Sequence, residues 1–291
     1  GSVITSWSVP TNGCWGAGVL SNGNVVIGDK SIPTQDHVVT PDGERTGVSW
    51  VADFGGQWAA DMAFDGEYLW QVNVGGDNAI YKMDPKTGEI LGYIVDPAWA
   101  AIPQRGLAYN PSDDTFYIGG WVDDIIYKIK GESWDEPGMV IDRWTMPVGI
   151  AGLAYHPAAN ILAVTSNSRD DMIYFVDPDS HVTIFEFPHP GSSANTGAGC
   201  EFGPCGNLWV ASQQEDCVYL VETQLGPVVS WLSWEPKAGS VPAGESANVK
   251  LRVDVSGLPP GAYEDHATLF TNDIENPMIV VPVTATITAP P

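Results

Sequence analysis

One phrase recurs along this 291-residue chain: a short strand that opens on a small or acidic residue, a turn, a second strand, and a third strand with a Tyr near its start. Four copies are clear, and they open with DMAF at Asp61, GLAY at Gly106, GLAY at Gly152 and GCEF at Gly199. A fainter copy opens at Gly18, and successive copies start 43 to 47 residues apart. Short strands repeated every 40 to 50 residues or so are the signature of a β-propeller, with one four-stranded blade per repeat.

The last copy lacks a fourth strand of its own, because the chain leaves the pattern after Glu222. A matching strand stands at the other end of the chain. Residues 4–10 (ITSWSVP) align with residues 141–147 (IDRWTMP) of another blade. A terminal strand in this position removes two open sheet edges. We therefore predict an all-β fold in which residues 1–227 form a five-bladed propeller closed by the N-terminal strand.

A second domain is predicted for residues 228–291, where strands of period two, such as Asn248–Val255 and Val280–Ile287, alternate with Gly/Pro turns. Its frame reads, in order, W-L-S, P-x-x-G-x-V-P-A-G, G-L-P-P-G-x-Y, T-N-D-x-x-N-P and V-P-V-T. This frame resembles the immunoglobulin-like modules appended to secreted bacterial proteins, often near extracellular peptidases. The resemblance implies a small β-sandwich, an extracellular or cell-surface location and a spacer or docking role. It brings no catalytic residues.

The propeller repeat has a resemblance of its own. The phrase DPKTG at Asp84–Gly88, which follows a Tyr-bearing strand, is similar to the YVTN, NHL and gluconolactonase-like group of propellers. The likeness covers the whole ring but mainly describes blade geometry. It therefore implies a fold and not a function.

Charge narrows the classes of partner. The net charge is -24, from 36 acidic and 12 basic residues, so the surface repels nucleic acid and anionic lipid. Cations, basic proteins and neutral sugars remain compatible with it. No apolar run approaches the roughly 18 residues that a membrane-spanning helix needs, so no membrane insertion is expected. We expect a monomer that binds a carbohydrate, peptide or protein ligand.

The four cysteines (Cys14, Cys200, Cys205 and Cys217) gather at the predicted ring closure. Such clustering predicts disulfides and an oxidising compartment, with three pairings open. Their spacing fits no common zinc site, and no cofactor is expected. The loops Asp177–Asp179 and Asn110–Asp114 contain residues that calcium favours, but both lack the 12-residue EF-hand frame, so turns are the preferred interpretation.

Ligands of propellers usually sit on one face, where the loops leading into first strands meet the loops between second and third strands. This rule places four tryptophans near one rim: Trp15, Trp58, Trp99 and Trp121. It also places four acids there: Asp77, Asp123, Asp170 and Glu215. Acids repeated in every blade are interpreted as turn-forming: Asp36, Asn78 (its amide equivalent), Asp124, Asp171 and Asp216.

Residues that break the repeat are better candidates for a site. Asp61 stands where other blades have Gly, Glu201 stands where three blades have Ala, and Arg105 ends a long loop. We expect both acids near the mouth of the central channel. They could bind a cation or a sugar hydroxyl, act as an acid–base pair, or simply be solvated or paired with Arg105.

Three functions follow from these patterns. The first is a secreted or cell-surface, non-catalytic binding or scaffold module, with its ligand on Trp15, Trp58, Trp99, Trp121, Arg105, Asp61 and Glu201. The second is an enzyme of the five-bladed type, a glycoside hydrolase or cyclotransferase, with Asp61 and Glu201 as catalytic residues. The third is a structural accessory region of a larger extracellular protein such as a peptidase. Because no nucleophile elbow, phosphate loop or metal-ligand spacing occurs, the first is preferred.

Overall fold

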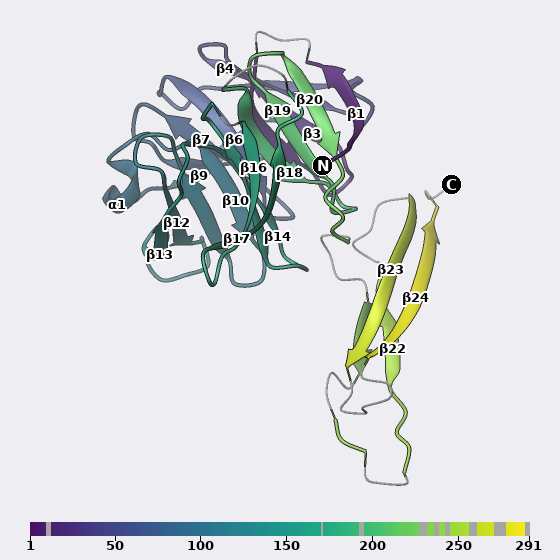
Figure 1. Ribbon diagram of the computed structural model, residues 1–291. Helices are drawn as coiled ribbons and strands as arrows, with labels where there is room; N and C mark the ends of the chain where they lie inside the picture. Colours follow the sequence, from purple (N-terminus) through teal and green to yellow (C-terminus); the bar gives the residue numbers. More distant parts are fainter. Residues whose placement is uncertain are drawn as a thin grey trace.

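The computed structural model describes residues 1–9, 13–169, 171–191, 195–226, 232–235, 239–241, 245–255, 261–270 and 278–288. Within them, five antiparallel four-stranded sheets stand around a common axis, as Figure 1 shows. The first strands contact one another in the cycle β2, β6, β10, β14, β18 and back to β2. The five-bladed propeller and the all-β class predicted from the repeat are therefore confirmed.

Each sheet is one repeat, with its strands in the predicted order. The first blade holds β2 (Cys14–Val19), β3 (Val25–Asp29), β4 (Thr34–Val39) and β5 (Arg45–Ala52). The second holds β6 (Trp58–Phe64), β7 (Leu69–Val74), β8 (Ile80–Met83) and β9 (Ile90–Ile94). The third holds β10 (Gly106–Asn110), β11 (Thr115–Gly119), β12 (Ile125–Lys130) and β13 (Val140–Thr145). The fourth holds β14 (Ile150–His156), β15 (Ile161–Ser166), β16 (Met172–Asp177) and β17 (Val182–Pro188).

The fifth sheet combines both parts of the ring sequence. It holds β18 (Gly197–Phe202), β19 (Leu208–Ser212), β20 (Cys217–Val221) and, outermost, β1 (Val3–Ser8). β1 pairs antiparallel with β20, so that Trp7 lies opposite Val218. The Trp7 ring lies 5.9 Å from that of Trp209, and its indole N–H donates to the Pro41 carbonyl of the first blade.

Small residues on the first strands have a steric cause, because these strands crowd the axis. A Cβ at Gly106 would lie 3.0 Å from the carbonyl carbon of Gly152 on the next first strand. A Cβ at Gly199 would lie 2.2 Å from the Asp61 carboxylate. Larger side chains on the sheet faces fill the space between neighbouring blades, where the apolar clusters of the core lie.

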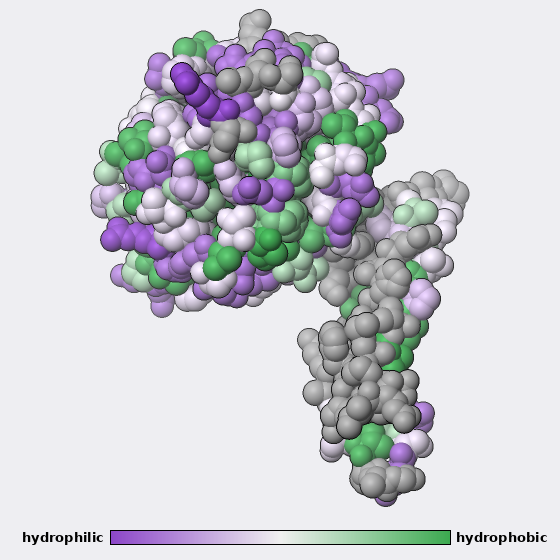
Figure 2. Space-filling view, in the orientation of Figure 1, coloured by the Kyte–Doolittle hydropathy of each residue, from purple (hydrophilic) through white to green (hydrophobic). Residues whose placement is uncertain are grey.

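A short helix, α1 (Pro97–Ala100), lies between the second and third blades. Asp96 caps it by accepting a hydrogen bond from the Ala98 N–H at 2.8 Å, and Pro97 suits the first helical position. No helix in the described part of the chain is long and apolar enough to cross a membrane. Figure 2 shows polar and apolar side chains interspersed over the visible face of the propeller.

After the propeller, four described strands form two hairpin-like pairs. β21 (Leu232–Glu235) pairs with β22 (Lys250–Val253), and β23 (Gly261–Phe270) pairs with β24 (Met278–Ile287). Leu232 and Tyr263 are buried between the two pairs. Much of the predicted frame, including residues 256–260 and 271–277, lies outside the described residues. The immunoglobulin-like sandwich and the boundary at residue 227 therefore stay predictions.

The cysteines correct one expectation, because all four are free thiols in this structure. Cys14 and Cys200 are buried in different interblade clusters. Cys205 is exposed in the turn after β18, and Cys217 begins β20. The repeat brings the four into two neighbouring blades of the ring, the first and the fifth.

Candidate functional site

The central channel has two mouths, and the residues that break the repeat are distributed between them. Arg105 immediately precedes its first strand, Asp61 lies in the middle of β6, and Glu201 lies near the end of β18. A strand rises about 3.3 Å per residue, so these offsets correspond to different heights along the axis. The sequence analysis placed all three beside the tryptophans at one mouth. The structure keeps Arg105 there and places Glu201 at the opposite mouth.

The tryptophan face, defined by Trp15, Trp58 and Trp121, lies where the chain enters the first strands. The Trp15 ring centroid is 5.1 Å from that of Trp58 and 6.3 Å from that of Trp121. The Arg105 guanidinium carbon lies 4.3 Å from the Trp15 ring, which is cation–π distance. Three tryptophans and the arginine predicted to meet at one rim therefore do so.

Gln213 ties this cluster together. Its side-chain oxygen accepts from the Trp15 indole N–H at 2.7 Å and from Arg105 Nη2 at 3.1 Å. Arg105 is 1% exposed and also donates to the Gly197 carbonyl. Burial lowers the pKa of Arg105 to about 10, and the charge of Asp61 opposes this shift, so the guanidinium stays charged at neutral pH. Trp15 and Arg105 are both buried and both hydrogen-bonded to Gln213, so they belong to the packed interior of this face.

The fourth tryptophan lies elsewhere. Trp99 belongs to α1, is fully buried and donates its indole N–H to the Gly138 carbonyl at 2.9 Å. It packs with the core between the second and third blades. The helix, which the repeat pattern did not indicate, turns this side chain away from the rim, and no ring surface is left for a ligand.

The predicted rim acids are engaged within their own blades. Each accepts a hydrogen bond from the Tyr hydroxyl four residues later: Asp77 from Tyr81 at 2.6 Å, Asp123 from Tyr127 at 2.7 Å and Glu215 from Tyr219 at 2.7 Å. The fourth, Asp170, lies outside the described residues. The residue after each described acid has a left-handed φ of 55° at Asn78, 56° at Asp124 and 50° at Asp216. These acids therefore shape turns.

Asp61 is a tie between blades. Its carboxylate is fully buried, and Oδ1 accepts from the Ala17 N–H at 3.5 Å. Oδ2 accepts from the N–H groups of Leu107 at 3.2 Å and Leu153 at 2.9 Å. Burial raises its pKa, and these backbone hydrogen bonds act in the opposite direction. Bonded to three other first strands and closed to solvent, Asp61 has no free oxygen for a substrate, so it cannot form a two-carboxylate catalytic pair with Glu201.

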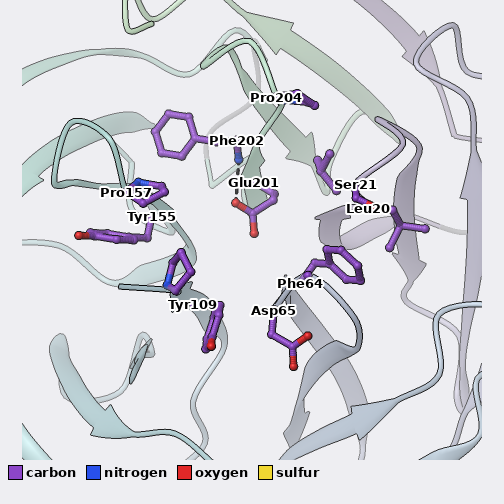
Figure 3. Close-up of a pocket in the computed structure, with 13 residues that line it drawn as sticks. Leu20, Ser21, Phe64, Asp65, Tyr109, Tyr155, Pro157, Glu201, Phe202 and Pro204 are labelled. Atoms are coloured by element: carbon purple, nitrogen blue, oxygen red, sulfur yellow. Dashed lines mark hydrogen bonds between the residues drawn. The ribbon is translucent and has the colours of Figure 1, made fainter. Parts of the chain in front are cut away.

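The opposite mouth opens into a cavity of about 240 Å³, shown in Figure 3. All five blades contribute the ends of their first strands or the turns that follow. The cavity is lined by Val19, Leu20, Ser21, Phe64, Asp65, Gly66, Tyr109, Pro111, Tyr155, Pro157, Glu201, Phe202 and Pro204. Aromatic rings and prolines dominate this lining, which contains two acids and no basic residue. We call it the exit pocket.

Glu201 is the polar centre of the exit pocket. Its side chain points into the cavity among Phe202, Tyr155 and Phe64 (Figure 3). Oε1 accepts from the Phe202 backbone N–H at 2.8 Å, and no hydrogen bond reaches Oε2 from the described residues. Burial raises the pKa of Glu201 well above its usual range, and the nearby charge of Asp61 adds to the shift. This carboxyl group therefore keeps its proton to a higher pH than an ordinary glutamate does, and it still has an open oxygen.

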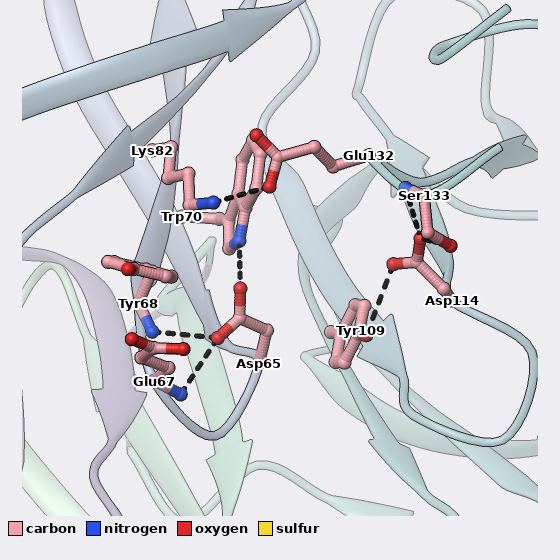
Figure 4. Close-up of polar contacts among 9 residues, drawn as sticks. All are labelled: Asp65, Glu67, Tyr68, Trp70, Lys82, Tyr109, Asp114, Glu132 and Ser133. Carbon is pink, nitrogen blue, oxygen red and sulfur yellow. Dashed lines mark hydrogen bonds and ion pairs between the residues drawn. The ribbon is translucent and has the colours of Figure 1, made fainter. Parts of the chain in front are cut away.

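The other pocket acid is already occupied. Asp65 Oδ1 accepts from the N–H groups of Glu67 and Tyr68, and Oδ2 accepts from the Trp70 indole at 2.7 Å (Figure 4). Across the gap between blades, Lys82 pairs with Glu132 and lies 4.0 Å above the Tyr68 ring. The three hydrogen bonds to Asp65 hold its carboxyl group in place on the lining of the pocket.

Tyr109 is fixed in the same way. Its hydroxyl donates to Asp114 Oδ1 at 3.1 Å, and Asp114 Oδ2 accepts from the Ser133 N–H at 2.7 Å (Figure 4). Tyr155 similarly donates to Asn160 at 2.8 Å. Both phenols are anchored outside the cavity, so the pocket receives their ring carbons and keeps its shape.

No described group of His, Cys, Asp and Glu side chains is arranged to hold a metal ion. In the loops that contain residues favoured by calcium, the side chains serve the backbone. Asp177 Oδ1 accepts from the Asp179 N–H at 2.9 Å, and Asn110 Oδ1 accepts from the Ser112 N–H at 2.9 Å. These are the hydrogen bonds of side-chain-capped turns.

Sequence analysis identified Glu201 but missed the aromatic residues around it. Phe64, Tyr109, Tyr155 and Phe202 occupy the same position in successive repeats, and the sequence analysis gave them no role in a site. A usable signal was present, because these large residues lie three positions after the repeat start, one residue past Glu201. The same offset in every blade brings the four rings to one mouth.

Comparison with known proteins gives the fold. No family model and no curated protein matches the chain. Among solved structures, glutaminyl cyclase from Myxococcus xanthus superposes with a TM-score of 0.60 at 11% sequence identity, covering 76% of this chain and 95% of that one. Streptogramin B lyase gives a TM-score of 0.45 at 17% identity, covering 72% and 65%. The first likeness supports the five-bladed propeller class, and neither assigns an activity.

Proposed function

We propose that this propeller is a binding module whose exit pocket takes a small ligand, or the end of a peptide, that carries an amine or ammonium group. The observation that carries the proposal is Glu201, a carboxyl group with an open oxygen among four aromatic residues, in a cavity without a basic side chain. A carboxylate supplies a charge-assisted hydrogen bond, and aromatic rings attract cations through their quadrupoles. The negative charge of the whole protein draws cations toward the site.

The magnitudes favour an anchor at Glu201. A hydrogen bond to a charged group contributes about 1.5–3 kcal/mol, and a desolvated cation–π contact contributes about 2 kcal/mol. Together they amount to about 3.5–5 kcal/mol, which suits an affinity in the millimolar to sub-millimolar range for a ligand that fills a cavity of about 240 Å³. A neutral sugar could pack on the rings but would gain no charge-assisted hydrogen bond from Glu201, so the amine is preferred over the carbohydrate.

Titration with benzylamine, followed by backbone amide shifts, tests the proposal, with benzyl alcohol as the neutral analogue. We expect benzylamine to shift Ser21, Gly66 and Phe202, and Glu201→Gln to weaken its binding about tenfold or more. Glu186→Gln, on the exposed outer strand β17, is the matched control and should bind as the parent does. Equal binding of the amine and the alcohol, or an unchanged affinity in Glu201→Gln, would contradict the proposal.

A second candidate is acid–base catalysis by the same carboxyl group. It is favoured by one observation, the raised pKa of Glu201 in a pocket that a substrate can enter. The Myxococcus protein of similar fold is named as a glutaminyl cyclase, and a single acid–base residue would suffice for a cyclisation. Ammonia release from a peptide with amino-terminal glutamine, lost in Glu201→Gln, would favour catalysis. Binding without turnover would favour the module.

The predicted extracellular location and the spacer role of residues 228–291 remain part of this proposal. The resemblance of the C-terminal frame to modules of secreted bacterial proteins supports them. The propeller reaches that segment through a linker tied to its pocket face, because the Gly226 carbonyl contacts His156 Nε2 at 2.8 Å. A spacer attached there would set how the exit pocket is presented.

A further inference from the structure

The exit pocket has an acidic neighbour inside the channel, and that neighbour is Asp61. Its Oδ1 lies 2.2 Å from the position that a Cβ of Gly199 would take. Glu201 is two residues further along β18, which is a rise of roughly 7 Å. The Asp61 carboxylate thus occupies the space that a side chain at position 199 would fill, two residues along β18 from Glu201.

Two carboxyl groups this close in a poorly solvated channel do not both ionise easily, and the better-solvated one takes the charge. Asp61 has three backbone N–H donors from three blades within hydrogen-bond distance, at 2.9, 3.2 and 3.5 Å. Glu201 has one, from its neighbour Phe202. The positive charge of Arg105 also interacts with Asp61. Burial raises the pKa of both acids, but the donors to Asp61 oppose the shift more strongly, so Asp61 is the better stabilised of the two as an anion.

We infer that Asp61 is a positioning residue for Glu201: its charge, fixed on the axis, keeps the proton on Glu201 in the empty pocket until a cationic ligand displaces it. This inference rests on the proposed function. The step is balanced, because the Glu201 carboxylic acid loses its proton to solvent and the resulting carboxylate pairs with the incoming ammonium. The pocket then stays neutral at Glu201 when empty and charges only when a cation arrives.

Other titratable groups that face Glu201 must be considered in its pH dependence. They are Asp65 after β6, Tyr109 at the end of β10, Tyr155 at the end of β14 and Cys200 on β18 itself. Asp65 lines the same pocket as Glu201. The two tyrosines are protonated, because burial and neighbouring carboxylates raise the pKa of each. Burial likewise keeps the Cys200 thiol protonated. β2 contributes Ala17 and Val19, which do not titrate.

The linkage makes binding depend on pH in a defined way. Below the pKa of Glu201, each ligand cation bound releases one proton, so the affinity rises about tenfold per pH unit. Above it, the affinity is level. With Asp61→Asn the repulsion is gone, so Glu201 ionises at lower pH and the rising part of the curve moves down with it.

The direct test is a carbon-13 titration of side-chain-labelled Glu in the full chain without ligand. We expect the Glu201 carboxyl to titrate above the other glutamates in the parent, and in Asp61→Asn to move toward the usual value by one pH unit or more. Asp42→Asn, an exposed acid, is the charge-matched control. A Glu201 that titrates with the exposed glutamates, or that is unmoved in Asp61→Asn, would overturn the inference.

A second measurement needs no variant and covers a failure of Asp61→Asn to fold. Calorimetry of benzylamine binding to the parent, in buffers of different ionisation enthalpy and at a pH below the Glu201 midpoint of the carbon-13 titration, should show release of close to one proton. Binding without proton release overturns the inference and leaves the proposed function intact. An absence of binding overturns the proposed function. The ligand-free titration would still test whether Asp61 raises the pKa of Glu201.

Discussion

At the scale of single residues, His189 gives the clearest pH dependence of stability. The side chain is 4% exposed, its Nδ1 accepts from the Gly191 N–H at 3.0 Å, and its Nε2 lies 3.3 Å from the Ala211 carbonyl. The ring is therefore neutral with its proton on Nε2. Burial lowers its pKa to about 4, against about 6.5 in an unfolded chain.

The sign follows from proton counting. Between pH 6.5 and 4 the unfolded chain binds more protons at this histidine than the native protein does, so the contribution is complete above about pH 6.5 and is lost as the pH falls toward 4. The full loss is about 3 kcal/mol. Urea unfolding at pH 7, 5.5 and 4.5 should therefore show a shallower decline for His189→Gln. The same substitution at the partly exposed His181 is the control, and an equal effect there would contradict the assignment.

Single residues were also where sequence analysis had its limits. The exceptions to the repeat led correctly to Asp61 and Glu201 as the unusual acids of the channel. Their separation along the channel axis could be read from the repeat. Asp61 is the first residue of its copy, whereas Glu201 is the third residue of its own. The hydrogen bonds of Asp61 could not be predicted from the sequence, because its donors come from strands 44 to 92 residues away.

At the scale of elements, an acid and a Tyr at the third strand form a small recurrent unit, which the structure shows in the second, third and fifth blades. The Tyr127 hydroxyl donates to Asp123 at 2.7 Å, and the ring is 5% exposed. Tyr127→Phe removes this bond and leaves the ring in place, so a loss of about 1 kcal/mol in unfolding free energy is expected. Chemical denaturation measures it. Tyr93→Phe on β9, where the side chain is 61% exposed, should cost much less.

Elements were the most predictable level of this molecule. Period-two strands and turn residues repeat in every blade, so each copy supports the interpretation of the others. The helix α1 was not predicted, because four residues are too few to show a period. The position of Trp99, which lies on this helix, was therefore predicted wrongly. The strands after residue 227 lack such internal repetition, and their predicted sandwich remains a prediction.

At the scale of the whole molecule, the chain's N-terminal strand lies at the outer edge of the last blade. β1 pairs with β20, the Val9 N–H donates to the Asp216 carbonyl at 2.7 Å, and the Glu222 N–H donates to the Ser2 carbonyl at 2.9 Å. Without β1, the β20 edge and Trp209 would be uncovered. A protein that lacks residues 1–9 should therefore be less stable by on the order of 3 kcal/mol, because several ladder hydrogen bonds are lost.

Thermal unfolding of the trimmed protein, with and without a synthetic peptide of residues 1–9, separates closure from other effects of trimming. If β1 completes the fifth blade, the peptide should bind the open edge and raise the melting temperature in a concentration-dependent way. A peptide with Trp7→Ala should do so poorly, because it loses the hydrogen bond to Pro41 and the packing on Trp209. A trimmed protein that melts at the same temperature as the parent, or whose melting temperature neither peptide changes, would show that the ring holds without this strand.

The same experiment tests the exit pocket, because β18, which carries Glu201, belongs to the same sheet as β1. Benzylamine binding should therefore weaken on trimming and return when the peptide is added.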